Sequence, residues 1–272
     1  MISQSEIYVI GKGFVKPEDL TIGNQVYTLD NDKVSIEPIT AVRSEFVSAR
    51  LNRIDSGAHN VLITPDALSL YQSEVYGYKY LTFDQIPAFT ADKEYRATKY
   101  VPVLSVPESS PRQINDDELE WIARSLLVHD YETKRFDDIM TRVSGLDCLV
   151  LIDMLEFWCS ITPGQGWFDR AQVKARSHKV NDKHWLDELC RAAALAGYTA
   201  SISEFRPYQY GLRVNYESKP IPGSRPKNEK YYKQHYTGLC YNVMASNKPI
   251  LGRSLGGRTF YLPTRSTLQE RN

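Results

Sequence analysis

The feature that most constrains the fold of this chain is a change in the spacing of its apolar residues. Polar and apolar side chains alternate in short segments through residues 6–104, and the alternation returns at 237–244 and 259–262. Between these ends the spacing lengthens to about 3.6 residues, which is typical of α-helices. A chain with β patterns at both ends and an α+β middle predicts one domain inserted into another.

Short strands separated by turns are predicted for the N-terminal part of the chain. Gly, Asp, Asn, Ser and Pro cluster at 11–13, 30–32, 55–57 and 64–66, where they favour tight turns. The predicted strands are 6–10, 25–29, 34–42, 50–55, 60–63, 67–71, 78–82 and 100–104. This part of the chain is therefore expected to be all β.

The middle of the chain carries helix signals. A Pro- and Ser-rich linker ends at Asn115, and Asn115 followed by Glu118 predicts a helix N-cap. Further helices are predicted over 149–157 and over 182–196, and Gly197 is the expected C-cap of the last one. Strands are expected at 199–204 and 210–216. The predicted domains are 1–110 (β), 111–220 (an α+β insert), 221–236 (a Pro- and Lys-rich connector) and 237–272 (β).

Composition limits the functional classes. Lys plus Arg and Asp plus Glu both number 33, but the basic excess lies in residues 169–272, so a polyanion is expected to meet that part. The four cysteines are scattered without a Cys-x-x-Cys pair, which predicts neither a disulfide framework nor a zinc site. No apolar run is long enough to span a membrane, and no leader opens the chain. A reduced, cytoplasmic setting is expected, with no membrane partner.

Both ends of the chain resemble the splicing domain of inteins, the Hint domain. An early strand and a Gly turn precede an apolar-Pro-acidic-Leu step at 15–20 and a Gly-x-x-Val-x-x-x-Asp strand at 23–30. Residues 60–70 resemble the block that reads Thr-x-x-His in inteins, and 239–243, 252–253 and 256–261 resemble the two C-terminal blocks. The resemblance covers about half of the chain and implies a Hint-like β domain built from both ends.

The middle resembles the LAGLIDADG, or DOD-type, homing endonucleases that many inteins carry. Residues 123–131 align with the family motif and place Asp130 at the acidic, metal-binding position, although Tyr131 replaces the usual Gly. Residues 173–177 and 186–198 resemble the strand and helix that close one endonuclease repeat. The second motif helix, 149–161, runs into 162–166 without an acid. The resemblance implies an inserted, degenerate LAGLIDADG-like α+β domain.

The residues that splicing requires are missing. Intein splicing uses a Cys or Ser nucleophile at the first residue, a Thr-x-x-His pair that protonates the scissile amide, and a terminal His-Asn that cyclises. Here the corresponding positions hold Met1 and Ile2, Ala67, and Pro263 and Thr264. An alternative would use Ser3 or Ser5 with His59 as the base, and it is disfavoured because His59 precedes the strand.

Two site hypotheses follow for the middle domain. Asp130 is the one candidate catalytic residue and the one candidate Mg²⁺ ligand; the missing second acid argues against efficient hydrolysis by a two-metal mechanism. Double-stranded DNA is the expected partner, because basic residues recur along a strand that lies over the DNA groove in the resembled fold. The candidate nucleic-acid-binding residues are Arg170, Lys174, Arg176, Lys179, Lys183 and Arg213.

The sequence thus predicts a splicing-inactive, intein-like protein with a remnant homing-endonuclease domain that binds DNA without efficient cleavage. Two alternatives stay open. One is a structural or adaptor protein that binds other phage proteins, for example in a virion. The other is an active Mg²⁺-dependent homing endonuclease whose second acid comes from elsewhere.

Overall fold

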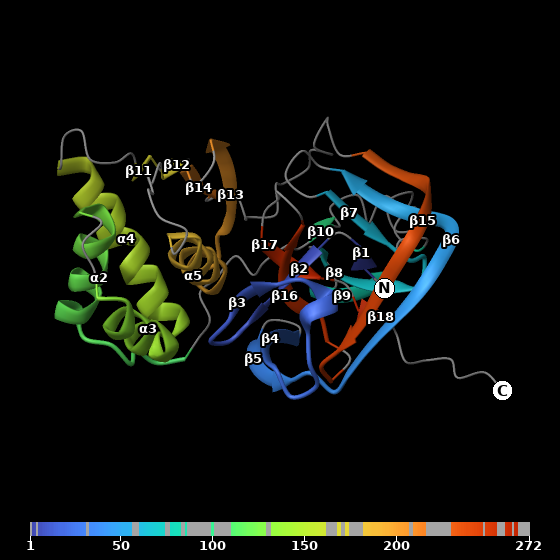
Figure 1. Ribbon diagram of the computed structural model, residues 1–272, viewed down its shortest axis with the longest axis horizontal. Coiled ribbons are helices and arrows are strands. Elements are labelled where there is room, and N and C mark those ends of the chain that lie inside the picture. Colours follow the sequence, from blue (N-terminus) through green and yellow to red (C-terminus); the bar gives the residue numbers. More distant parts are fainter. Residues whose placement is uncertain are drawn as a thin grey trace. The chain divides into compact units, whose positions relative to one another are not determined.

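The computed structural model describes residues 2–3, 5–30, 33–55, 60–73, 77–82, 85, 99–100, 110–128, 132–161, 168–169, 172–173, 182–206, 209–215, 230–246, 248–254, 259–262 and 264–265. The chain forms two compact units. Unit 1 combines Met1–Pro102 with Pro220–Asn272, and unit 2 is Val103–Lys219. Most of the described regular structure is β-strand, and the α-helices described all lie in unit 2 (Figure 1).

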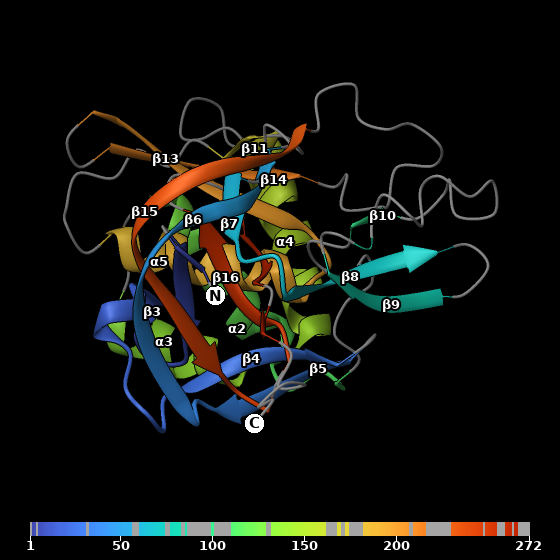
Figure 2. The same cartoon turned by 90° about the vertical axis from the view of Figure 1, so that its right-hand side faces the viewer.

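Unit 1 contains a closed β-barrel with the strand order β1-β15-β6-β7. These strands are β1 (Ile2–Ser3), β6 (Ala41–Asp55), β7 (Asn60–Ile63) and β15 (Lys230–Met244). β6 and β15 are antiparallel over their full length, from Ala41 opposite Met244 to Asp55 opposite Lys230. They form the long curved ribbon that crosses Figure 2. β1 closes the barrel between β15 and β7.

Two further sheets complete unit 1. The larger has the order β17-β16-β2-β4-β5, with β3 beside β2, and the smaller has the order β10-β8-β18, with β9 beside β8. The strands of the larger sheet are β2 (Ser5–Val9), β3 (Gly13–Val15), β4 (Gln25–Asp30), β5 (Lys33–Pro38), β16 (Ile250–Ser254) and β17 (Thr259–Leu262). Those of the smaller sheet are β8 (Ala67–Ser73), β9 (Gly77–Thr82), β10 (Lys99–Tyr100) and β18 (Thr264–Arg265). A short 3-10 helix, η1 (Pro17–Asp19), follows β3.

The core of unit 1 draws on both segments of the chain. Its main cluster consists of Ile7, Val9, Leu20, Val26, Ile39, Ile63, Ala67, Val243, Ala245, Ile250 and Leu262. Burial of these side chains, at roughly 25 cal/mol per Å² of apolar surface, is the principal force that holds the two segments together. The prediction that strands from the two chain ends share one core is confirmed, since β15 pairs with β6 and β16 pairs with β2.

The predicted strand 34–42 is confirmed for residues 34–38 in β5, but it is not one strand, because the chain leaves the ladder at 39–40 and residues 41–42 belong to β6. β5 ends at Pro38, which has no N–H to donate to a ladder. The N–H of Ile39 donates to the carbonyl of Asn24 (2.8 Å) and the N–H of Thr40 to that of Met244 (2.8 Å). These two bonds pass the chain from the larger sheet to the barrel.

The long ribbon also corrects the sequence analysis. β6 begins well before the predicted strand 50–55, and β15 begins before the predicted 237–244. Residues 230–236, expected to belong to the connector 221–236, are therefore strand. The predicted domain ranges differ from units 1 and 2 at two places. Residues 103–110 were expected in the N-terminal β domain and belong to unit 2, whereas residues 220–236 were expected in the insert and connector and belong to unit 1.

Unit 2 is built from four described helices, α2 (Asp116–Val128), α3 (Thr133–Arg142), α4 (Gly145–Ile161) and α5 (Asp182–Leu195). α4 packs against both α2 and α5. The predicted N-cap of α2 is confirmed, since the N–H of Glu118 donates to Asn115 Oδ1 (2.8 Å). α3 was not predicted, and it contributes Phe136, Ile139 and Met140 to the interior.

α5 and the sheet of unit 2 lie close to their predicted ranges. The predicted cap at Gly197 is confirmed: this residue has φ 91°, and the N–H of Tyr198 donates to the carbonyl of Ala193 (2.7 Å). The sheet order is β11-β12-β14-β13, and α5 packs against β13 and β14. Its strands are β11 (Phe168–Asp169), β12 (Gln172–Val173), β13 (Thr199–Arg206) and β14 (Gln209–Asn215).

Candidate functional site

Three segments that are distant in sequence meet at one junction in unit 1. Ile2 of β1 lies opposite Ile63, the last residue of β7. The chain then turns at Thr64, where the N–H of Ala67 donates to the carbonyl of Thr64 (3.0 Å). Beyond the turn, β8 pairs with β18, so that Ala67 lies opposite Arg265. The N-terminal strand, the turn and the C-terminal strand therefore converge, and we call this place the strand junction.

The described positions of the strand junction offer no acid–base group where splicing would need one. Ala67 is fully buried, and its methyl group neither donates nor accepts a proton. Thr64 is also buried, at 6% exposure. Ser3 lies opposite Leu62 in β1, and Ser5 is buried in β2. Met1, His59 and Pro263 lie outside the described residues, so the alternative in which His59 acts as the base stays a prediction.

A buried amide that the sequence analysis missed lies next to the strand junction. Asn52 of β6 lies opposite Ile63 and has 0% exposure. Within the part of the chain that the structure describes, neither Oδ1 nor Nδ2 of Asn52 has a hydrogen-bond partner. An unpaired buried amide costs about 1–3 kcal/mol of stability. No pattern in the sequence signals it, because a single polar residue in a strand usually faces solvent.

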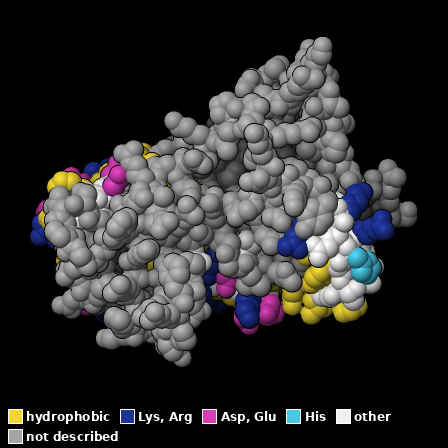
Figure 3. All heavy atoms as spheres, turned by 90° about the horizontal axis from the view of Figure 1, so that it is seen from above, with side chains coloured by type: hydrophobic (Ala, Val, Ile, Leu, Met, Phe, Trp, Pro, Cys, Tyr) yellow, Lys and Arg dark blue, Asp and Glu magenta, His cyan; other side chains and the backbone are white. Residues whose placement is uncertain are grey.

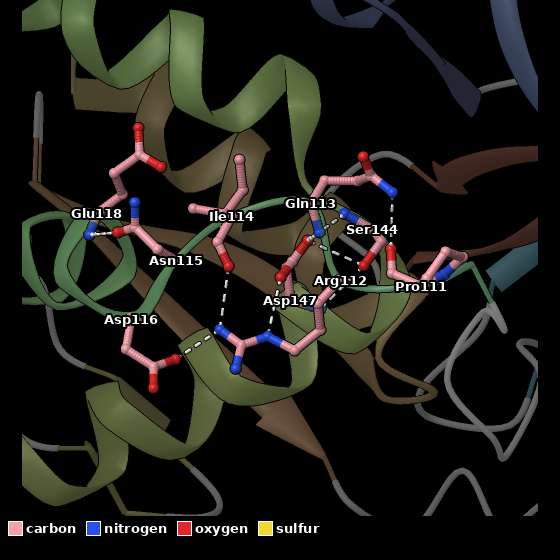
Figure 4. A network of polar contacts seen from close by, with 9 residues as sticks. All are labelled: Pro111, Arg112, Gln113, Ile114, Asn115, Asp116, Glu118, Ser144 and Asp147. Atoms are coloured by element: carbon pink, nitrogen blue, oxygen red, sulfur yellow. Dashed lines mark hydrogen bonds and ion pairs between the residues drawn. The ribbon is translucent and has the colours of Figure 1, made fainter.

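In unit 2 a fully buried carboxylate, that of Asp147, lies in the first turn of α4. Its Oδ2 accepts hydrogen bonds from the N–H of Ser144 (3.0 Å) and of Gln113 (2.8 Å) and from the Ser144 hydroxyl (2.9 Å). Its Oδ1 accepts one from Arg112 Nε (3.1 Å). Figure 4 shows Arg112 reaching Asp147 and Asp116 and so fixing the segment before α2 onto the start of α4.

The network around Asp147 is that of a structural anchor. Ser144 Oγ in turn accepts from the N–H of Asp147 (3.1 Å), which completes a capping box. Burial by itself raises the pKa of Asp147, but the N–H groups of Gln113 and Ser144, the Ser144 hydroxyl and Arg112 together lower it. Both carboxylate oxygens are engaged by protein donors, so Asp147 is a poor metal ligand. The spacing Ser144-x-x-Asp147 is a local signal that would have identified this cap.

Four of the six candidate DNA-binding residues, Arg170, Lys174, Arg176 and Lys179, lie outside the described part of the chain, as does Asp130, the candidate catalytic residue and Mg²⁺ ligand. Arg213 lies opposite Ser201 in the β13–β14 pair. Lys183 is near the start of α5, with Nζ 3.3 Å from Asp187 Oδ2 and a side chain 40% exposed. Asp187 offsets part of the positive charge of Lys183, which weakens the attraction that Lys183 could exert on a phosphate.

Other features bear on metal, redox and membrane chemistry. Among the described residues, no group of three or more His, Cys, Asp and Glu side chains is placed to hold a metal ion. Cys148, Cys190 and Cys240 are buried and form no disulfide with one another, and burial raises the pKa of Cys240. No helix among the described residues combines the length and apolar character needed to cross a membrane.

No protein-family model matches this chain, and no curated protein matches its sequence.

Proposed function

We propose that this protein is an intein-like chain that has lost splicing activity, carries a degenerate endonuclease-like unit, and binds double-stranded DNA without efficient cleavage. The observation that supports the loss of splicing is the composition of the strand junction. Three segments resembling splicing blocks converge there, and the acid–base position is held by Ala67, which is fully buried.

The chemistry of the junction explains the expected inactivity. A positioned general acid or base contributes about 10²–10⁴-fold to a rate, and a methyl group contributes nothing of this kind. Ile2 has no nucleophile, and Thr264 has no amide side chain to cyclise. At the positions that correspond to the intein blocks, each step of splicing therefore lacks its reactive group.

The test of lost splicing is a fusion of the full chain between two reporter peptides. After incubation with thiols or hydroxylamine, mass spectrometry is expected to show only the intact fusion. A cleaved, branched or ligated species would contradict the proposal. If such a species forms and disappears in Ser3→Ala, the alternative with a Ser nucleophile and His59 is correct.

DNA binding is supported by the basic excess in residues 169–272 and by the candidate contacts of unit 2. Binding to a generic duplex should weaken with salt, with a log–log slope near −0.9 per phosphate contact. In the double variant Lys174→Ala/Arg176→Ala, that slope should become shallower by the amount expected for about two phosphate contacts. Lys134→Ala/Arg135→Ala, on the exposed surface of α3, removes the same charge and is the matched control.

Two outcomes would select the alternative functions. Magnesium-dependent nicking that is lost in Asp130→Asn would establish an active endonuclease. Absence of binding at low salt, where phosphate attraction is strongest, would instead favour a structural or adaptor protein of an assembly such as a phage particle.

A further inference from the structure

Strand β6 has an edge that no described strand covers over most of its length. β15 pairs with one edge of β6 from Ala41 to Asp55, whereas β7 pairs with the other edge only over 52–55. Figure 1 shows β6 along the outer margin of the ribbon, with β15 on its inner side. Every second residue of an edge strand directs its N–H and C=O groups away from the sheet, where another strand can bind them. We call residues 41–51 on this side the free edge of β6.

The ribbon is exposed on both of its faces along the free edge. On one face Phe46 is 68% exposed, and Leu239, which lies opposite it in β15, is 49% exposed. On the other face Arg43 and Glu45 are exposed, and neither forms an ion pair with another described residue. Figure 3 shows apolar side chains at the surface of unit 1 next to cationic and histidine side chains. Charged residues on an edge strand often prevent pairing, so the order of the charges decides whether a second strand can bind.

The order of these charges allows one symmetric pairing. When two copies of one strand pair antiparallel about a two-fold axis, the axis passes through a residue, because opposite residues must share a face. An axis at Arg43 or at Glu45 sets like charges against each other. An axis at Ser44 instead sets Arg43 of each copy opposite Glu45 of the other, which gives two pairs of opposite charge. Within the free edge, an axis at any other residue gives no such pair.

The same axis would cover the exposed Phe46. It places Phe46 of each copy opposite Val42 of the other copy. Within one chain Phe46 lies opposite Leu239, and Val42 lies opposite Val243. An apolar row would therefore cross all four strands, from Leu239 of one copy to Val243 of the other. Val42 packs against the main core cluster of unit 1, to which Val243 belongs, so Phe46 would meet the margin of the second copy's core.

We propose that the free edge of β6 is a self-association site, at which two copies of this chain pair antiparallel with the two-fold axis at Ser44. The pairing joins the two β6–β15 ribbons into one four-stranded sheet. Backbone hydrogen bonds provide affinity, while the charge pairs between Arg43 and Glu45 fix the register. The site belongs to unit 1 and does not depend on the proposed binding of DNA.

The size of the contact sets the expected strength of the dimer. The paired segment, residues 41–47 of each copy, is short compared with a standard interface, which buries about 800 Å² per partner. The dimer is therefore weak, and it forms reversibly at high protein concentration. A second copy fits the free edge better than an unrelated strand does, because the edge itself supplies both the opposite charges and the apolar residue that the pairing needs.

Sedimentation velocity of the full-length protein at low salt, from micromolar to nearly millimolar concentration, tests the site. The wild-type protein should shift from monomer to dimer. Arg43→Glu and Glu45→Arg each set two pairs of like charges across the axis, so each should raise the dissociation constant of the dimer about 10-fold or more. The double variant Arg43→Glu/Glu45→Arg restores opposite charges and should regain the wild-type constant. Arg50→Glu makes the same change of charge at an exposed position outside 41–47, and this control should leave the constant nearly unchanged.

Disulfide cross-linking tests the register. Directly opposite residues of an antiparallel pair have Cα atoms about 4.5–5.5 Å apart, a separation that a disulfide can span. Ser44→Cys places a thiol opposite the same thiol of the second copy and should give a covalent dimer under mild oxidation. Ser48→Cys, at an exposed position farther along the same face, places the two thiols beyond disulfide reach. The wild-type protein measures any cross-linking through its own cysteines.

Each experiment has an outcome that would overturn the inference. A wild-type protein that stays monomeric over the whole concentration range has no such site. A dimer that Arg43→Glu leaves intact, or that the double variant fails to restore, is held together elsewhere. Equal cross-linking of Ser44→Cys and Ser48→Cys would exclude the axis at Ser44. Melting temperatures of all variants check that they are folded.

Discussion

Two buried polar side chains, one in each unit, show opposite solutions to the same physical problem. Asp147 in unit 2 is a charged group with four protein donors around it. Asn52 in unit 1 is a neutral amide to which the described residues offer no hydrogen-bond partner. A satisfied polar group stabilises and orients its surroundings, whereas an unsatisfied one costs free energy. The comparison identifies Asp147 as a structural anchor and Asn52 as a weak point beside the strand junction.

The largest effect is expected from removing the anchor. Asp147→Ala should lower the free energy of unfolding of unit 2 by about 2–4 kcal/mol, because the cap of α4 is lost and the donors around it are left without an acceptor. Urea denaturation followed by circular dichroism measures this change. The control Asp117→Ala, at an exposed position of α2, should cost less than about 1 kcal/mol. If both variants lose the same unfolding free energy, Asp147 contributes no more to the stability of unit 2 than an exposed carboxylate does.

A smaller effect, opposite in sign, is expected at Asn52. Asn52→Leu replaces the amide with an apolar group of the same branched shape, though of larger volume, and removal of the buried amide should stabilise unit 1 by about 1–3 kcal/mol. Thermal unfolding of the variant and of Ser48→Leu, an exposed position on the same strand, measures the difference. A marked loss of stability in Asn52→Leu would show that the amide is engaged in the protein in solution, and the contrast with Asp147 would disappear.

The smallest effect is a pH dependence that should follow Asp147. Its pKa is lowered in the folded protein from the ordinary value of 3.8, so its contribution is fully present above that value and is lost as the pH falls through the folded pKa. Unit 2 should therefore lose stability below about pH 4, and Asp147→Asn should flatten this dependence. Unfolding free energies measured from pH 6 to pH 2 test the expectation. An unchanged pH profile in Asp147→Asn would assign the acid sensitivity to other carboxylates.

Helices and strands were predicted most accurately where one face is buried and the capping residues lie close by in the sequence. α5 was located because its apolar face and Gly197 lie within one continuous segment. The long β6–β15 ribbon was underestimated, since residues 43–49 are largely exposed on both faces and show no alternation of burial. Alternation of apolar and polar residues reveals a strand only when one of its faces is buried. A ribbon that is exposed on both faces shows no such alternation.

The candidate site was predictable only in part for a related reason. Ala67 and the turn before it were recognised from the resemblance to splicing blocks, and the structure places them beside Ile2 and β18. Arg112 and Asp147 are far apart in sequence, and only the fold brings them to 3.1 Å. Asn52 is conspicuous only when its neighbours are known, because the same residue in an exposed strand would hydrogen-bond with water.

The discontinuous make-up of unit 1 has a consequence for the order of folding. Ser48 and Thr237, which touch on the ribbon, are 189 residues apart in the chain. Contacts between residues so far apart in the chain form slowly, because the chain loses entropy in closing the long loop before the stabilising contacts are made. Unit 2 is made from one continuous segment, so it is expected to fold first and shorten the effective loop between the two strands. A substitution that destabilises unit 2, such as Asp147→Ala, would then also slow the pairing of β6 with β15.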